Sequence, residues 1–397
     1  MEYDVTIIGC GIVGLSVGYH LKKERPGLQL AFIEKEKDIA KHQTGRNSGV
    51  IHSGIYYKPG SAKARNCKQG YDLLVQFCKE QEIHFEICGK LIVATDANEE
   101  KALDTIYERG VENGLKGLKT LNSEEIMAIE PYVRGTKGIL VPQAGIVDYS
   151  QVAKKLKENL EEMGAHFFFG NALKEISGKE KLILSFGNNK IVSKYMVNCA
   201  GLYSDKIAKM NGVKLKAKII PFKGEYFLIK ENKRYLIKNL VYPVPDPKFP
   251  FLGVHFTRRI NGEIDAGPNA VLALGREGYH KFEINFKELI ESVFFKGFLR
   301  MALRYWKVGI YEMHRSFSKK AFVKSLQKLV PEIREEDLKV GNSGIRAQIC
   351  YENGKLADDF LIQYSANAVH VVNAPSPAAT SSLQIGKTIC NKLISRI

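Results

Sequence analysis

The first part of the chain alternates between apolar runs and short polar breaks, a pattern that predicts a strand, a glycine turn, a helix and a second strand. Residues 4–8 form a β-branched run, and apolar residues recur at helical spacing over 15–21. Between them stands the G-x-G-x-x-G pattern, written here as Gly9-Cys10-Gly11-Ile12-Val13-Gly14. A further apolar run at 28–33 predicts the second strand, which ends at Glu34.

A glycine turn between a strand and a helix is typical of a dinucleotide-binding site. The glycines let the backbone approach a pyrophosphate, and the N–H groups at the start of the helix stabilise its charge. Glu34 follows the last glycine by about 20 residues, where a carboxylate can bond both hydroxyls of an adenosine ribose. The spacing therefore predicts a dinucleotide with an unphosphorylated ribose and leaves NAD and FAD both open.

Beyond Glu34 the pattern becomes irregular before regular elements return. The run 43–54 is rich in glycines, small hydroxyls and amides, a composition that suits backbone wrapped around a ligand. Ser61 is expected to cap a helix that reaches Cys78, and Ser150 a helix that ends at Gly164. The other expected elements, in order, are short strands at 90–95 and 138–141 around a helix near 98–113, a helix start at 123, strands at 165–169 and 192–201, a helix at 204–210, strands at 218–221 and 225–229, helices over 285–330, a strand at 368–372 and a final helix from near Ala378.

The elements typical of a dinucleotide fold lie at both ends of the chain and in its middle. We therefore predict an α/β protein with a doubly wound, Rossmann-like cofactor domain that a β-rich α+β substrate domain interrupts twice. The cofactor domain is expected to comprise residues 1–82, 146–214 and 340–397, and the substrate domain residues 83–145 and 215–339.

The composition narrows the class of protein. The 397 residues are 45% hydrophobic and 26% charged, as in ordinary globular proteins, and exceed what one core usually holds. No apolar run approaches the ~18 residues of a membrane span, and we expect neither a signal peptide nor export from the cytoplasm. The seven cysteines form no C-x-x-C pair, so neither a zinc site nor a disulfide framework is indicated, and no metal site is expected.

The formal net charge of +16 favours anionic partners, yet the basic residues are spread through the chain. A solvated, lysine-rich surface explains this, and we expect no nucleic-acid partner; an FAD-dependent tRNA-modifying protein is the distant alternative. The aromatic and basic segment 285–307 has two interpretations. It either packs as core helices or contacts the inner face of an acidic cell membrane and passes electrons to a quinone.

The wrapping run and the proline-rich start of the final helix favour FAD over NAD. Longer motifs then resemble the L-2-hydroxyglutarate dehydrogenase/oxidase family, within the flavoproteins related to D-amino-acid oxidase and glycerol-3-phosphate dehydrogenase. The resemblance extends almost from end to end and is weakest across 280–330. The motifs that carry it are His42-Gln43-Thr44-Gly45, Asn47-Ser48-Gly49-Val50-Ile51-His52-Ser53-Gly54-Ile55-Tyr56-Tyr57, Tyr242-Pro243-Val244-Pro245-Asp246, Phe251-Leu252-Gly253-Val254-His255-Phe256, Gly267-Pro268-Asn269-Ala270 and Asn373-Ala374-Pro375-Ser376-Pro377-Ala378-Ala379-Thr380-Ser381-Ser382.

The resemblance implies noncovalent FAD, a substrate domain of antiparallel sheet, and oxidation of L-2-hydroxyglutarate to 2-oxoglutarate with electrons passed to oxygen or a quinone. Related flavoenzymes that act on another 2-hydroxy acid, glycerol 3-phosphate or an amine are the nearest alternative. The residues expected at the cofactor are Gly9, Gly11, Ile12, Val13, Gly14, Glu34, Lys35, Thr44, Gly45, Asn47, Ser48, Gly49, Leu173, Ala200, Gly201, Pro377, Ala378, Ala379 and Thr380.

Oxidation of a 2-hydroxy acid requires a hydride acceptor at flavin N5, a base for the hydroxyl proton and cations for the carboxylates. Histidine suits the base because its ordinary pKa lies near neutrality. Chain order and resemblance place His52 beside the flavin ring, with His255 as the rival or as a substrate contact, whereas His370 inside an apolar strand is expected to be structural.

A dicarboxylate substrate favours arginine, whose planar fork bonds a carboxylate through two donors. Arg346 stands where related amine and hydroxy-acid oxidases carry a carboxylate-binding arginine. Lys223, Tyr226 and Tyr242 are weaker candidates for the distal carboxylate. The final helix is expected to direct its N-terminus at the pyrimidine edge of the flavin, where its dipole would stabilise negative charge.

Overall fold

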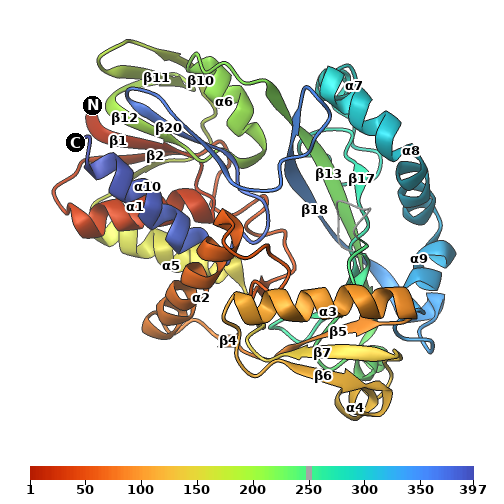
Figure 1. The fold of residues 1–397 in the computed structure, drawn as a ribbon. Coiled ribbons are helices and arrows are strands. Elements are labelled where there is room, and N and C mark those ends of the chain that lie inside the picture. Colours follow the sequence, from red (N-terminus) through yellow and green to blue (C-terminus); the bar gives the residue numbers. More distant parts are fainter. Residues whose placement is uncertain (247–252) are drawn as a thin grey trace.

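The computed structural model describes residues 1–246 and 253–397. Figure 1 shows two sheets side by side, one associated with both chain termini and the other with the middle of the chain. Pro247, in the proline-dense run, and Phe251 and Leu252, in one of the resembling motifs, lie outside the described residues.

The first sheet has a parallel centre of the doubly wound kind. Its parallel strands run in the spatial order β9–β2–β1–β12–β20. The hairpin β10–β11 joins β12 in antiparallel fashion, and β19 joins β20 in the same way. The strands are β1 (Glu2–Ile8), β2 (Leu30–Ile33), β9 (His166–Phe168), β10 (Leu173–Ser177), β11 (Leu182–Phe186), β12 (Asn189–Asn198), β19 (Leu361–Tyr364) and β20 (Ala368–Asn373).

Helices cover one face of this sheet, and the hairpin β10–β11 with a short helix covers the other (Figure 1). Apolar side chains on the two faces of β1 enter separate clusters, because successive residues of a strand point to opposite faces. The covering helices are α1 (Ile12–Glu24), α2 (Ala62–Glu80), α5 (Tyr149–Glu162) and α10 (Ser382–Ile394) on one face and α6 (Ser204–Met210) on the other.

The second sheet is mixed rather than purely antiparallel, because β5 and β14 pair in parallel. Its order is β17–β13–β16–β15–β14–β5–β7–β6, and β18 pairs with the free side of β13. The strands are β5 (Lys90–Ala94), β6 (Lys119–Asn122), β7 (Lys137–Val141), β13 (Ala217–Ile229), β14 (Leu240–Pro243), β15 (His255–Arg258), β16 (Ile264–Gly267), β17 (Val271–Leu272) and β18 (Leu338–Tyr351).

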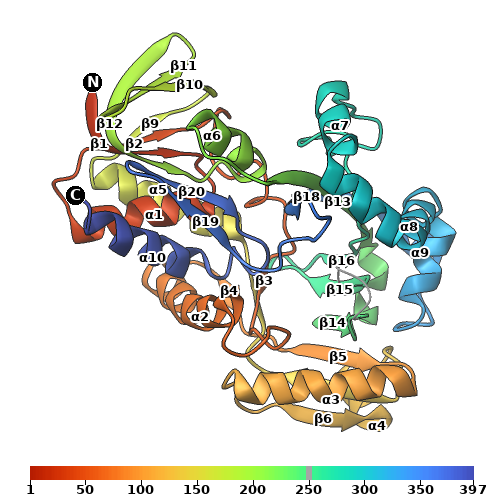
Figure 2. The same cartoon turned by 45° about the horizontal axis from the view of Figure 1, so that its top comes forward.

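A small three-stranded sheet, five further α-helices and the 3₁₀ helices Gly201–Tyr203, Glu231–Leu236 and Glu335–Asp337 complete the described elements. The small sheet connects the two large ones, and its order is β3–β8–β4. Helices α7, α8 and α9 lie along the outer side of the second sheet, away from the first (Figure 2). These elements are β3 (Val50–Ile51), β4 (Phe85–Glu86), β8 (Gly145–Val147), α3 (Ala97–Glu112), α4 (Ser123–Ile129), α7 (Phe286–Val293), α8 (Lys296–Phe317) and α9 (Lys319–Leu326).

Two local predictions were wrong. The carboxylate of Asp148, not the hydroxyl of Ser150, caps α5, and it accepts a hydrogen bond from the Ser150 N–H at 2.8 Å. The two strands expected at 218–221 and 225–229 form the single strand β13, because β18 pairs with it continuously across the Lys223–Gly224 break. The first of these predictions missed the rule that an aspartate two residues before a helical N–H is a strong cap.

Some elements depart from the expected division into domains. β18 begins at Leu338, just before the segment expected in the cofactor domain, and runs through the first part of that segment, but it pairs with β13 in the second sheet. The rest of that segment, β19, β20 and α10, packs with the first sheet. The domain boundaries therefore stay a proposal, with the end of β18 as the better point of division.

The interpretation of 285–307 as core helices was wrong for its outer face. Met301 is buried, but Phe294 is 74% exposed, Leu303 78% and Trp306 56%. Within the described residues, no helix combines the length and the apolar character that crossing a bilayer would require.

Candidate active site

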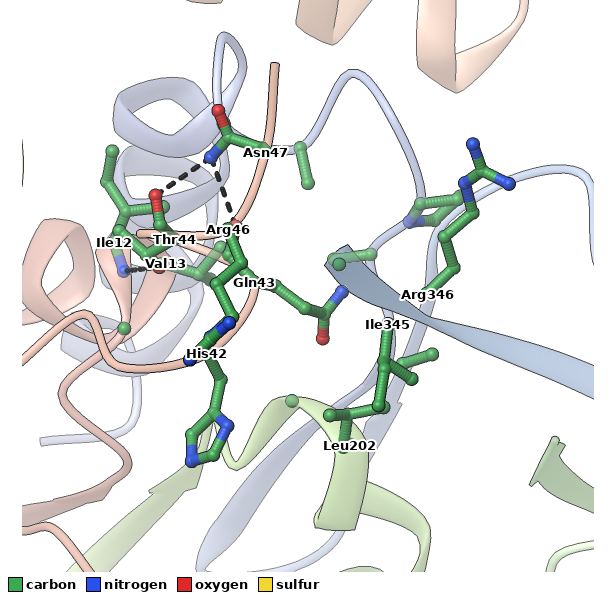
Figure 3. Close-up of a pocket in the computed structure, with 18 of the residues that line it drawn as sticks. Ile12, Val13, His42, Gln43, Thr44, Arg46, Asn47, Leu202, Ile345 and Arg346 are labelled. Atoms are coloured by element: carbon green, nitrogen blue, oxygen red, sulfur yellow. Dashed lines mark hydrogen bonds between the residues drawn. The ribbon is translucent and has the colours of Figure 1, made fainter. Parts of the chain in front are cut away.

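A cavity of about 960 Å³ lies between the two large sheets and is lined by residues of both. It begins at the glycine turn after β1 and extends to the strands of the second sheet. Figure 3 shows Ile12, Thr44 and Asn47 on one side of it and Arg346 on the opposite side. A cavity of this volume is large enough for a dinucleotide together with a small substrate.

The glycine turn forms one end of the cavity and fits a pyrophosphate. Helix α1 begins directly after Gly11, which offers no side-chain cap; the Thr44 hydroxyl accepts from the Ile12 N–H, and Gly11, Ile12 and Val13 line the cavity. A methyl group on Gly9 would lie 2.6 Å from the Cys199 carbonyl oxygen. The close packing leaves room at the start of α1, where the main-chain N–H groups and the helix dipole favour an anion.

Glu34, at the end of β2, lines the same end of the cavity. Its two carboxylate oxygens accept hydrogen bonds from the main-chain N–H groups of Cys10 at 2.7 Å and Glu36 at 2.9 Å. These bonds fix the carboxylate beside the glycine turn, and each oxygen retains acceptor capacity for a ribose hydroxyl.

Asn47 holds the wrapping segment in shape. Its side-chain amide donates to the carbonyl oxygens of Gln43 and Thr44, at 3.0 and 2.8 Å, and its Oδ1 accepts from the Gly49 N–H. Thr44 in turn accepts a hydrogen bond from the Ile12 N–H at 3.0 Å, which joins the segment to α1 (Figure 3). The segment is thus folded around its own side chains and presents its backbone to the cavity.

Most residues expected at the cofactor line this cavity: Gly9, Gly11, Ile12, Val13, Glu34, Lys35, Thr44, Asn47, Ser48, Leu173, Ala200, Gly201, Pro377, Ala378 and Ala379. Four others lie behind its wall: Gly14, Gly45, Gly49 and Thr380. Methyl groups on Gly14 and Gly45 would lie 2.2 and 2.3 Å from backbone oxygens, and Gly49 has a φ of +71°. These glycines therefore serve backbone packing rather than direct contact.

His52 lies at the middle of the cavity, and three hydrogen bonds fix it. Its main-chain N–H donates to the Thr380 hydroxyl at 3.1 Å, and its carbonyl oxygen accepts from the Cys67 thiol. Its Nε2 lies 3.4 Å from the Ser376 hydroxyl. Burial, with the positive charge of Lys90 and the neighbouring His255, lowers the pKa of His52 to about 3, so its imidazole is neutral at neutral pH.

His255, at the start of β15, faces the same cavity from the second sheet. Its Nδ1–H donates to the Gly253 carbonyl oxygen at 2.8 Å, which leaves Nε2 as the acceptor of the neutral ring. The ring stacks on Tyr242 with centroids 4.0 Å apart. Burial lowers the pKa of His255 to about 3 as well.

Arg346 on β18 and Tyr226 on β13 both line the cavity, and each affects the other's ionisation. Burial lowers the pKa of the Arg346 guanidinium, which nevertheless stays charged at neutral pH. The structure does not bring Lys223 to the cavity. Its ammonium group lies 3.5 Å from the Glu225 carboxylate and donates to the His280 carbonyl oxygen, because odd-numbered residues of β13 face away from Tyr226.

The final helix begins later than expected. α10 starts at Ser382, and residues 377–381 form turns that pass the cavity.

His370 contributes to the core rather than to the cavity, because its two ring nitrogens lie 3.2 and 3.1 Å from the side-chain amides of Asn198 and Asn211. All seven cysteines are free thiols.

Sequence reasoning missed several residues that line the cavity, among them Tyr56, Gln348 and Glu277. Tyr56 lies within the motif at 47–57 that carries the family resemblance. Gln348 follows Arg346 by two residues on a strand, so the period of two places both on one face. No sequence signal indicates Glu277, since its position depends on contacts between distant segments.

A network of charged and polar groups joins the segment after β2 to the loop before α7, near Glu34. The ammonium group of Lys35 lies 2.5 Å from the Glu277 carboxylate and 2.8 Å from His42 Nε2. His42 Nδ1 lies 2.6 Å from the Tyr279 hydroxyl. The loop that carries Glu277 and Tyr279 is further fixed by the buried ion pair between Arg276 and Asp205.

Comparison with known proteins shows what the whole chain is similar to. The model of the FAD-dependent oxidoreductase family named DAO matches residues 4–392. The L-2-hydroxyglutarate dehydrogenase of Indibacter alkaliphilus is 52% identical over 398 residues, which cover all of both chains. The mitochondrial L-2-hydroxyglutarate dehydrogenase of Homo sapiens is 42% identical over all of this chain and 89% of its own.

Solved structures share the fold at lower identity. The L-α-glycerophosphate oxidase of Mycoplasma pneumoniae, determined with FAD bound, superposes with a TM-score of 0.81 at 20% identity over 99% of this chain and 95% of its own. Glycine oxidase from Geobacillus kaustophilus superposes with a TM-score of 0.75 at 16% identity over 100% and 95% of the two chains. The predicted fold class is therefore confirmed.

Proposed function

The chain belongs to the DAO family of FAD-dependent oxidoreductases, and we propose that it oxidises L-2-hydroxyglutarate to 2-oxoglutarate. The proposal rests on one observation: residues that suit a dinucleotide and residues that suit a small substrate line the same cavity. The glycine turn and Glu34 provide a dinucleotide site, while His52, His255 and Arg346 face the same space. The names of the relatives at 52% and 42% identity support this substrate.

The residues of the site fit FAD. The start of α1 would hold the pyrophosphate, Glu34 the ribose, and the backbone of the segment around Asn47 the remaining length. Bound FAD would supply the acceptor for the hydride that leaves C2 of the substrate. The turns at 377–381 would direct the positive end of α10 toward it, and we expect no covalent attachment.

The side chains of the cavity divide the remaining work. Arg346 would bind a substrate carboxylate through its two-pronged donor set, and Tyr226 and Tyr242 would contribute hydroxyl donors to the other carboxylate. His52, which lines the cavity, would accept the proton from the C2 hydroxyl as the carbonyl forms. His255 Nε2 would contact the substrate from the opposite wall.

Anaerobic titration of the purified protein with a panel of reductants tests the substrate. L-2-hydroxyglutarate, D-2-hydroxyglutarate, L-lactate, glycerol 3-phosphate and glycine would be added separately, and the loss of the flavin absorbance band followed. We expect loss with L-2-hydroxyglutarate alone at low concentration. Loss with glycerol 3-phosphate or glycine instead would assign the site to another reaction of the same family.

The exposed face of α7 and α8 supports a further part of the proposal, contact with a membrane surface. The large exposed apolar side chains on this face, which we name the helical stripe, are Phe286, Ile290, Phe294, Leu299, Leu303, Trp306 and Ile310. Exposed basic residues flank them at Lys287, Lys296, Arg300, Arg304 and Lys307. An apolar stripe beside cations is typical of helices that lie on an anionic lipid surface.

Such contact would bring the reduced enzyme to a membrane quinone, while oxygen remains the alternative electron acceptor. Sedimentation with phosphatidylglycerol vesicles at low salt tests the contact, with phosphatidylcholine vesicles as the neutral comparison. The double variant Leu303→Glu, Trp306→Glu should lose binding, and Val111→Glu, at an exposed position of α3, should retain it. Equal sedimentation of both variants would argue against the helical stripe. Reoxidation of the reduced protein by a soluble quinone or by oxygen then separates the two acceptors.

A further inference from the structure

Lys90, the first residue of β5, is a buried cation directly behind the wall of the substrate cavity. The side chain is 1% exposed, and among the described residues no carboxylate forms an ion pair with it. Its ammonium group lies 4.5 Å from the ring centroid of Tyr56 and 4.8 Å from that of Tyr242. Both of these rings line the cavity.

Removing an ammonium ion from water without a carboxylate partner is costly, and contact with two aromatic faces restores only part of the lost hydration. The Tyr56 hydroxyl is also buried and has no hydrogen-bond partner among the described residues. A cation and a hydroxyl donor thus lie together at one wall, and both lack an anionic or accepting partner. The positive charge behind this wall is therefore not offset by the protein, and an anion bound in the cavity would offset it.

We propose that Lys90 is a positioning residue of the substrate site, which holds the rings of Tyr56 and Tyr242 and supplies the positive charge that a bound dicarboxylate requires behind that wall. The inference deepens the proposed function and rests on it, because the dicarboxylate is the proposed substrate. Lys90 acts through the two rings and through its field, since it does not itself line the cavity. Arg346, from the second sheet, would provide the direct contact.

Binding of a dianion next to this ammonium group should be linked to proton uptake. Burial lowers the pKa of Lys90 to about 7, so the side chain is largely neutral above that pH in the free site. A bound dicarboxylate favours the charged form, and the ligand should therefore draw a proton onto Lys90.

The other titratable groups around Lys90 do not change charge between pH 7 and 9. Burial raises the pKa of the Tyr56 and Tyr242 hydroxyls above their ordinary value, and that of the Cys67 thiol to about 12. His52 and His255 have pKa values lowered to about 3. Proton uptake on ligand binding between pH 7 and 9 would therefore identify Lys90 as the group that takes up the proton.

Calorimetric titration of the oxidised, FAD-bound protein with 2-oxoglutarate, in buffers of different ionisation enthalpy, measures both affinity and protons bound. For the natural protein we expect uptake of most of one proton at about pH 8, and affinity that falls from pH 7 to 9. Lys90→Met should bind on the order of tenfold more weakly at pH 7, without uptake. Lys90→Arg, which is always charged, should bind without uptake and with an affinity that does not change over this pH range.

Lys22→Met is the matched control, because Lys22 is also buried but bonds only backbone oxygens far from the cavity. It should behave as the natural protein does. Retained FAD absorbance shows that each variant has folded, and the arginine variant tests the charge if the methionine variant has not. Unchanged affinity and proton uptake in Lys90→Met would overturn the inference while leaving the proposed function intact. Absence of 2-oxoglutarate binding and of reduction by L-2-hydroxyglutarate in the natural protein would overturn both.

Discussion

The main-chain N–H of His52 donates a hydrogen bond to the side-chain hydroxyl of Thr380, 3.1 Å away, although 328 residues separate the two in the chain. The same hydroxyl lies 2.8 Å from the phenol oxygen of Tyr149. A buried threonine thus joins the segment that carries the candidate base to the turns before α10 and to the start of α5. The position of the imidazole depends on this junction.

Thr380→Val should displace His52, while the valine side chain still fills the space that the threonine side chain occupies. The change leaves the His52 N–H without its acceptor, which costs about 1–3 kcal/mol of folding free energy, whereas the Tyr149 hydroxyl still donates to the Val50 carbonyl oxygen. Displacement of the imidazole should also slow flavin reduction by roughly tenfold or more. Thermal unfolding and stopped-flow absorbance measure the two effects. Thr380→Ser keeps the hydroxyl and should resemble the natural protein, and equal behaviour of the two variants would contradict this role.

The glycine turn offers a test of the cofactor site. A methyl group on Gly14 would lie 2.2 Å from the Gly9 carbonyl oxygen, so Gly14→Ala must separate α1 from β1. We expect a protein that loses FAD during purification and is less stable by about 1–3 kcal/mol. Gly27→Ala is the control, since nothing lies within 4 Å of its added methyl group. Full retention of FAD by Gly14→Ala would show that the turn does not hold the pyrophosphate.

The sequence reveals features that depend on neighbours along the chain. The strand, turn and helix of residues 2–24 follow from a period of apolar residues and three glycines, and the Ser61 cap of α2 follows from one hydroxyl before a helical pattern. Family motifs extend this knowledge to the cofactor, and the expectation of FAD rather than NAD is confirmed by the family.

Features that depend on contacts between distant segments were not predictable. The continuity of β13 requires β18, which pairs with it from more than a hundred residues away. In the sequence, Lys90 looks like an ordinary lysine at the start of a strand. It is buried only because β5, β14 and the loop after β3 pack together. Lys223 shows the reverse case, because its place in the strand turns its side chain away from the cavity.

The two histidines should differ in their effects. His52→Ala should keep bound FAD while flavin reduction by substrate slows by roughly a hundredfold to ten-thousandfold, as expected for loss of a general base. His255→Ala should mainly raise the Michaelis constant. Because burial lowers the pKa of both rings to about 3, kcat/KM should not fall as pH decreases through 6.5, the ordinary value. An unchanged reduction rate in His52→Ala would remove His52 from the mechanism.

Arg346→Lys preserves the charge but loses the planar pair of donors. We expect the Michaelis constant for L-2-hydroxyglutarate to rise by about tenfold or more, with a smaller change in kcat, because the lost hydrogen bonds serve mainly binding. Steady-state kinetics at fixed acceptor concentration measure both constants. Arg134→Lys, at an exposed position outside the cavity, is the matched control. A normal Michaelis constant in Arg346→Lys would leave the substrate carboxylate without its proposed partner.

A single anaerobic turnover tests the central claim most directly. The purified, FAD-bound protein is mixed with an excess of L-2-hydroxyglutarate in the absence of oxygen, and the flavin absorbance and the 2-oxoglutarate formed are both measured. We predict complete loss of the oxidised flavin band with one equivalent of 2-oxoglutarate per FAD, and no change with the D-enantiomer. A band that persists with the L-enantiomer, or a protein that binds no FAD, would contradict the proposed function.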